Sequence, residues 1–212
     1  MNENSVSRFK GLLKVMDIIY LIGVVLSGIG TLALVGLTIF ITSVSEGTLN
    51  KFLQADHSKV MMSIGGLNYE FTKSFISEHL AVNKGLLISV LIIAILNAVL
   101  FLLMMWYARK LIHKFSKNEV FSNNNGKFIE TIAILFLFAG HTYKLMISML
   151  SMFIDKSLNL SHYLSEADVI RKVSYNLISL DWNIILIAIT IWFIGRAFRY
   201  GAYLQNEYDA TV

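Results

Sequence analysis

The sequence predicts an all-α integral membrane protein with four transmembrane helices and both termini in the cytoplasm. Apolar residues make up 56% of the 212-residue chain, above the roughly 45–50% of soluble domains. The mean hydropathy is +0.63, and a surface that faces lipid explains this excess. No Pro/Gly/Ser-rich linker divides the chain, so we expect residues 1–212 to form a single multi-pass domain in the cell membrane.

Four long apolar runs carry the fold prediction. The expected spans cover about residues 18–41, 86–107, 128–153 and 177–195. The first has 24 residues, about 36 Å of helix, which is enough to cross the hydrocarbon core with some tilt. A cleaved signal peptide is the alternative, but its apolar region is normally shorter. Within this run Gly23, Ser27 and Thr31 recur every four residues, a spacing that lets another helix pack closely.

The positive charges predict the orientation. The loop from Arg109 to Lys127 holds five cations against one acid, Glu119, and a short loop with that bias stays in the cytoplasm. Lysines and arginines number ten on the predicted cytoplasmic side and seven in the outer loops, residues 43–84 and 154–176. Four spans with both termini inside fit this distribution.

The two outer loops predict a small extracellular cap. Apolar residues alternate from Val60 to Ile64 and from Leu67 to Phe71, on either side of Gly65-Gly66, which is the pattern of a β-hairpin. In the second loop, Ser165 with the acids after it predicts a helix start. Ile170, Val173 and Leu177 then share a face, so we expect an amphipathic helix that leads into the fourth span and covers the hairpin.

A buried polar layer is predicted from Asn97, His141, Lys144 and Asp181 on three different spans. At about 1.5 Å per residue, Lys144 and Asp181 reach similar depth in the membrane. Each isolated charge would cost at least about 2.5–3.5 kcal/mol near the middle of a span, so we expect the two to pair. The alternatives are a polar group satisfied by neighbours, side chains that reach the headgroups separately, and a proton or ligand site at His141.

The sequence offers no recognisable catalytic or metal site. It has no cysteine, which excludes disulfides, cysteine-ligated metals and thiol catalysis. It lacks the HExxH, G-x-S-x-G and Walker-type motifs, and the loop histidines His57, His79, His113 and His162 are scattered. We therefore expect a protein that is not an enzyme and needs no cofactor.

Two segments carry a resemblance: EVFSNNNGKFIETIAIL and IWFIGRAFRYGAYLQNEYDATV. They resemble a bacterial family of small four-span membrane proteins of unassigned function, with a Phe-Ser turn before the third helix and a tail of the form G-x-x-L-Q-x-E-x-D-x-T-V. The matching positions are Phe121, Ser122, Gly201, Leu204, Gln205, Glu207, Asp209, Thr211 and Val212. Members of that family are often encoded beside a small Cro/CI-type helix-turn-helix regulator. The resemblance thus implies a membrane partner for a transcription regulator, without catalytic activity.

Two function classes follow from the sequence. In the first, the outer loops sense an envelope or peptide signal, and Phe121, Ser122, Gln205, Glu207 and Asp209 contact a regulator in the cytoplasm. In the second, the protein is an immunity or protective protein against a membrane-active peptide. The expected partners are the lipid bilayer and the regulator, and the sequence allows a homo-oligomer. Direct nucleic-acid binding is not expected, because the end of the tail is acidic.

Overall fold

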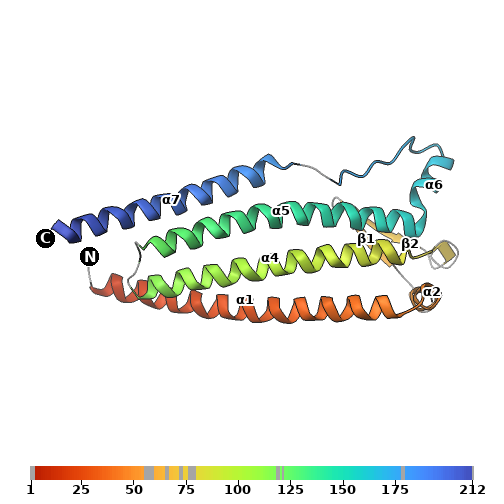
Figure 1. Ribbon diagram of the computed structural model, residues 1–212. Coiled ribbons are helices and arrows are strands. Elements are labelled where there is room, and N and C mark those ends of the chain that lie inside the picture. The colour runs from red at the N-terminus through yellow and green to blue at the C-terminus, as the bar shows by residue number, and fades with distance from the viewer. Residues whose placement is uncertain are drawn as a thin grey trace. The chain divides into compact units, whose positions relative to one another are not determined.

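The computed structural model describes residues 3–54, 60–64, 67–71, 74–75, 80–117, 120, 122–177 and 180–211. These residues form six helices and two strands, coloured along the chain in Figure 1. In order they are α1 (Glu3–Ser43), α2 (Glu46–Gln54), β1 (Val60–Ile64), β2 (Leu67–Phe71), α4 (Lys84–Ser116), α5 (Asn123–Leu158), α6 (Leu160–Glu166) and α7 (Trp182–Thr211).

Four of these helices are long and apolar enough to cross a membrane: Gly11–Ser43, Lys84–Ser116, Asn123–Leu158 and Trp182–Tyr208. At most 11% of the most apolar stretch of each is buried within the protein. Large side chains such as Leu32 and Phe193 are instead exposed, as expected of a surface that lipid covers. The helical fold class and the number of candidate spans agree with the sequence prediction, and the orientation in the membrane stays a prediction.

The helices do not end where the apolar runs end. α4 continues to Ser116 instead of stopping near Tyr107, and α5 begins at Asn123 instead of near Phe128. Lysine and arginine are good helix formers, so a helix can continue through charged residues after the apolar run is over. For the same reason α7 reaches Thr211, far past the predicted end at Gly195.

The predicted amphipathic helix after Ser165 is wrong. Ser165 lies in the last turn of α6, which Asp168 ends with a left-handed backbone (φ 54°). The amide of Val169 donates to the carbonyl of Leu164 (2.9 Å), and that of Asp168 donates to the carbonyl of Ser165 (3.1 Å). This pattern stops a helix, and residues 170–177 are not helical. The fourth span accordingly starts at Trp182, not at 177.

The chain divides into two compact units. Unit 1 consists of Met1–Ala33, Ile95–Tyr143 and Ser179–Val212, and unit 2 of Leu34–Ala94 and Lys144–Ile178. Within unit 1, α1 lies against α4, since a Cβ on Gly23 would be 3.2 Å from the Met105 methyl carbon Cε. The side chain of Asn97 on α4 donates to the carbonyl of Ala139 on α5 (2.8 Å).

Unit 2 is held by polar contacts of its connecting segments. β1 and β2 pair antiparallel, with Ile64 opposite Leu67, and Gly65 and Gly66 lie outside the described residues. The Nζ atom of Lys84 donates to the carbonyls of Thr42 (2.8 Å) and Val44 (2.7 Å). These two bonds satisfy carbonyls at the C-terminal end of α1, a position that favours a cation.

Asp155 fixes the segment that follows α5. Its carboxylate accepts a hydrogen bond from the amide of Ser161 (2.6 Å) and one from the hydroxyl of Tyr175. Burial and the bond to Asp155 raise the pKa of Tyr175 above its usual value of 10.0. The hydroxyl therefore stays protonated and keeps donating to the carboxylate across the physiological pH range.

Candidate functional site

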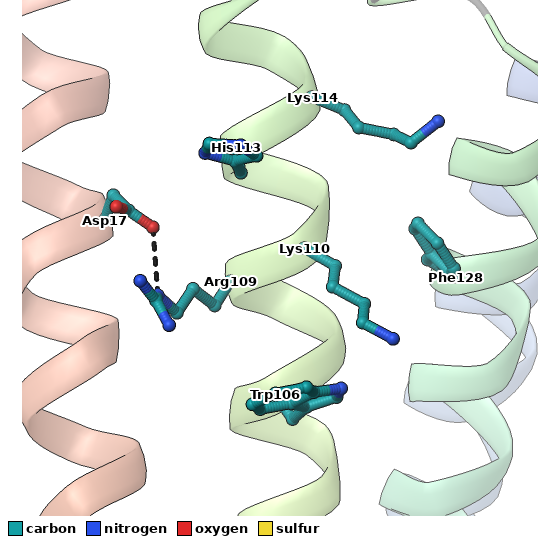
Figure 2. Close-up of a pocket in the computed structure, with 7 residues that line it drawn as sticks. All are labelled: Asp17, Trp106, Arg109, Lys110, His113, Lys114 and Phe128. Atoms are coloured by element: carbon teal, nitrogen blue, oxygen red, sulfur yellow. Dashed lines mark hydrogen bonds and ion pairs between the residues drawn. The ribbon is translucent and has the colours of Figure 1, made fainter.

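The predicted cytoplasmic ends of the four long helices all belong to unit 1, and one ion pair joins the first two. Nε of Arg109 on α4 donates to Oδ1 of Asp17 on α1 at 3.1 Å (Figure 2). Both side chains are about one-third exposed, at 31% and 28%. A pair in this setting gains only modest free energy, because solvent screens the charges.

The start of α5 is built by Ser122 and Asn125. The amide of Asn125 donates to the side-chain oxygen (3.2 Å) and to the carbonyl (3.0 Å) of Ser122, as an N-terminal helix cap does. The fully buried side chain of Asn125 donates to the carbonyl of Val120 (3.0 Å). These bonds tie Val120 and Ser122 to the first turn of α5.

α5 and α7 approach each other through two glycines. A Cβ added to Gly126 would lie 2.7 Å from the carbonyl oxygen of Gly195, and a Cβ on Gly195 would lie 2.9 Å from the carbonyl oxygen of Gly126. No side chain fits at either position without moving a backbone. Small residues are the usual means by which membrane helices come this close.

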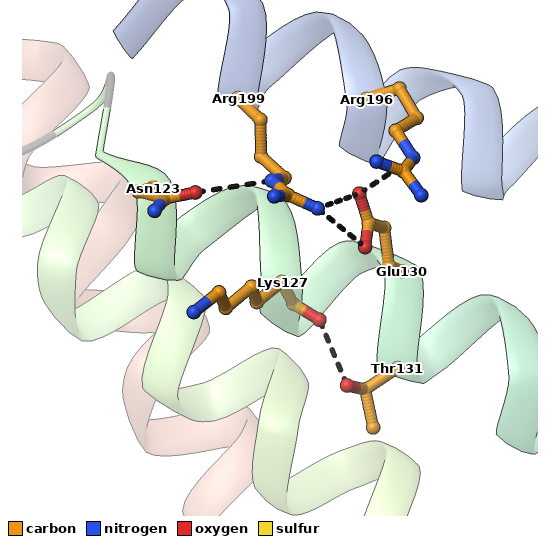
Figure 3. Close-up of polar contacts among 6 residues, drawn as sticks. All are labelled: Asn123, Lys127, Glu130, Thr131, Arg196 and Arg199. Atoms are coloured by element: carbon orange, nitrogen blue, oxygen red, sulfur yellow. Dashed lines mark hydrogen bonds and ion pairs between the residues drawn. The ribbon is translucent and has the colours of Figure 1, made fainter. Parts of the chain in front are cut away.

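A charged network lies directly beside this contact (Figure 3). Glu130 on α5 forms an ion pair with Nε of Arg196 (3.3 Å) and accepts a hydrogen bond from Nη1 of Arg199 (3.3 Å), both on α7. Nε of Arg199 also donates to Oδ1 of Asn123 at the start of α5 (3.1 Å). The Glu130 side chain is only 14% exposed, so this one carboxylate balances two cations in a largely dehydrated position.

Beyond Arg199, α7 continues as a helix with an aromatic surface. Tyr200, Tyr203, Leu204 and Tyr208 are all exposed, and Tyr208 most of all, at 71%. The rings of Tyr200 and Tyr203 stack, with centroids 6.5 Å apart. Next to them is a groove of about 420 Å³, lined by Asn123, Arg196, Arg199, Tyr200, Ala202, Tyr203 and Asn206.

The predicted partner-contact residues are distributed over this region. Ser122 caps α5, and Gln205 and Glu207 are exposed on α7. Glu207 accepts a hydrogen bond from the hydroxyl of Tyr203. Asp209 lies in the last turns of α7, where its side chain is outside the description, and Phe121 lies outside the described residues altogether.

Two members of the predicted polar layer, Asn97 and His141, make separate local contacts in the structure. The side chain of Asn97 donates to the carbonyl of Ala139 and to Oγ1 of Thr142 (2.9 Å). Nδ1 of His141 lies 2.8 Å from the carbonyl oxygen of Leu137 in its own helix, and its buried Nε2 has no hydrogen-bond partner among the described residues.

The other two members of that layer belong to different units, Lys144 to unit 2 and Asp181 to unit 1. Asp181 precedes the first residue of α7, and its Oδ1 accepts from the amide of Asn183 (2.9 Å). It therefore acts as an N-terminal cap of α7. The pairing of Lys144 with Asp181 stays a prediction.

Sequence reasoning did not find the role of Glu130. The sequence did contain a signal for this contact. Gly126 precedes Glu130 by one helical turn, and Gly195 stands directly before Arg196, so residues small enough for close helix packing lie next to charged ones. Within the part of the chain that the structure describes, no group of three or more His, Cys, Asp or Glu side chains is arranged to hold a metal ion. Comparison with known proteins found no matching family model, no matching curated protein and no matching solved structure.

Proposed function

We propose that this protein is a non-enzymatic membrane signalling partner, and that the end of α7 docks a small helix-turn-helix transcription regulator. The observation that carries the proposal is the exposed continuation of α7 past Arg199 to Thr211. A helix that served only to cross the membrane would not need this extension. The outer loops would receive an envelope or peptide signal, and α7 would present the docking surface on the opposite side.

The composition of the extension supports a protein contact. Its exposed tyrosines offer large, rigid side chains at low conformational cost, and such residues dominate binding energy at interfaces. Gln205 and Glu207 add an amide and a carboxylate at the same end of the helix. A helix with an apolar face and a polar border is a common way to dock into a groove of a partner.

The anchoring of α7 supports it further. The Gly126–Gly195 contact and the bonds of Arg199 to Asn123 and Glu130 hold α7 at the point where the extension begins. The start of the docking helix is thereby fixed relative to α5. A preorganised surface binds more tightly than a mobile one, because less entropy is lost on association.

Replacement of Gln205, Glu207 and Asp209 by alanine tests this proposal. The tagged protein is solubilised in mild detergent from cells that coexpress the regulator, and the recovered regulator is quantified. We expect at least a tenfold loss of the regulator, since each lost interface contact of about 1 kcal/mol weakens binding roughly fivefold. Membrane insertion and the amount of purified protein should be unchanged.

The matched control replaces one exposed amide and two exposed carboxylates elsewhere: Asn183, Glu46 and Glu166. This variant should retain the regulator. Equal recovery with the wild-type chain and with the tail variant would refute the docking role, and would favour a protective function of the outer loops.

A further inference from the structure

A second cavity of unit 1, of about 470 Å³, lies beside the Asp17–Arg109 pair (Figure 2). Its lining combines cations with aromatic rings: Asp17, Trp106, Arg109, Lys110, His113, Lys114 and Phe128. Among these residues there are three permanent cations and one acid, and the acid is bound to Arg109. The lining side chains therefore include more cations than acids, which favours an anion.

Aromatic rings hold Lys110 at the cavity. Its Nζ lies 5.3 Å from the centroid of the Trp106 ring, 5.6 Å from that of Tyr107 and 6.0 Å from that of Phe128. The rings attract the ammonium group weakly and leave its strong hydrogen-bonding capacity to an oxygen ligand. Tryptophan and tyrosine prefer the headgroup layer of a membrane, so this end of α4 suits the depth of the lipid phosphates.

One face of α4 runs from this cavity along the apolar part of the helix. Val99, Leu103, Trp106, Lys110 and Lys114 follow one another at intervals of three or four residues, a spacing that places them along one side of a helix. The first two are exposed apolar residues, Trp106 comes next, and the two lysines follow. The face is thus apolar at one end and cationic at the other. It complements an anionic phospholipid, which has apolar acyl chains and a negatively charged headgroup.

We propose that this cavity binds an anionic phospholipid, with the phosphate at Lys110 and Lys114 and an acyl chain along Val99 and Leu103. Basic cavities between transmembrane helices are suited to anionic headgroups. A soluble phosphate ion shares the headgroup chemistry, but it would make no use of the apolar half of the face. The lipid site does not depend on the proposed docking of a regulator on α7, so either proposal can be refuted without the other.

The test is a lipid titration of the purified chain in a neutral detergent, with bound lipid counted by native mass spectrometry. Phosphatidylglycerol should bind the wild-type chain, and phosphatidylcholine should bind far more weakly. For the Lys110→Gln/Lys114→Gln variant, we expect about 30-fold weaker phosphatidylglycerol binding, roughly fivefold for each lysine. Inorganic phosphate at the same concentration as the lipid should not displace it.

Matched variants separate a built site from general surface charge. Lys14→Gln/Lys127→Gln also removes two exposed lysines of unit 1 that do not line the cavity, and it should stay within about fivefold of the wild-type chain. Lys110→Arg/Lys114→Arg keeps both charges and should retain binding, which guards against a folding defect in the glutamine variant. An equal loss with the control pair, full displacement by inorganic phosphate, or equal binding of phosphatidylcholine would overturn the proposal.

Discussion

Two helix contacts of unit 1, α5 with α7 and α1 with α4, combine a glycine with an arginine–carboxylate pair but differ in how firmly they are fixed. At α5–α7 each glycine faces a backbone carbonyl of the other helix. At α1–α4 Gly23 faces the flexible end of the Met105 side chain, and Gly28 has only ordinary contact with Leu102. The α5–α7 contact has no room for an added carbon atom, whereas at the α1–α4 contact the Met105 side chain can move aside.

The ion pairs at the two contacts differ in the same way as the packing, with the more buried pair at α5–α7. Glu130 is 14% exposed and serves two arginines, whereas Asp17 is 28% exposed and serves one. Removal of its partners should destabilise the more buried group more, because less water is available to replace them. Packing and charge therefore agree that α7 is fixed to α5, and that α1 is held to α4 less tightly. The proposed docking helix follows the more firmly fixed of the two contacts.

The largest effect should come from Glu130→Gln. This change leaves Arg196 and Arg199 close together without a counter-charge. We expect a loss of about 2–3 kcal/mol in the free energy of unfolding, below the roughly 3–5 kcal/mol of fully buried pairs because both arginines are partly exposed. Tryptophan fluorescence during SDS titration in mixed micelles would measure it.

Glu166→Gln is the matched control for that measurement. Glu166 pairs with His162, but the two side chains are 63% and 53% exposed. The change should cost less than about 0.5 kcal/mol. Equal losses in the two variants would mean that Glu130 is not the central group of the α5–α7 contact.

The second effect is a contrast between two glycine-to-alanine changes. Gly195→Ala puts a methyl group within 2.9 Å of the Gly126 carbonyl, and we expect a loss of about 1–3 kcal/mol from overpacking. Gly23→Ala meets only the Met105 methyl group at 3.2 Å, which can rotate away, so its effect should stay within about 0.5 kcal/mol. Thermal melting of both variants in one detergent compares them. If Gly23→Ala proved as costly as Gly195→Ala, the two contacts would be equally rigid.

The sequence predicted the helices better than their ends. Apolar runs identify candidate spans directly, because a crossing segment must be both long and apolar. Ends depend on competition between local conformations, as at Asp168, where a left-handed residue stops α6 inside the region predicted to be a helix. Such a conformation is uncommon for a residue other than glycine, and although aspartate adopts it more often than most residues, the residue type alone was a weak signal.

The candidate site was predictable only in part. The exposed polar end of the chain could be recognised from its residues, since Gln205 and Glu207 follow the last cations of the fourth span. The partners of those cations could not be identified, because Arg196 and Arg199 reach an acid 66 and 69 positions away in the sequence. The close approach of Gly126 and Gly195 helps to bring Glu130 within reach of both.

A smaller effect on stability than those of Glu130→Gln and Gly195→Ala should come from Asp17→Asn, which removes the acid of the α1–α4 contact. The pair is partly exposed, and Arg109 can turn its side chain toward water or headgroups, so we expect a loss of at most about 1 kcal/mol. The same change raises the positive charge of the cavity beside Arg109, and phosphatidylglycerol binding should therefore strengthen by up to about fivefold. Thermal melting and lipid titration of this one variant measure both quantities. A stability loss as large as that of Glu130→Gln would show that α1 is held as firmly as α7, while weaker lipid binding would show that Asp17 positions Arg109 for the headgroup instead of competing with it.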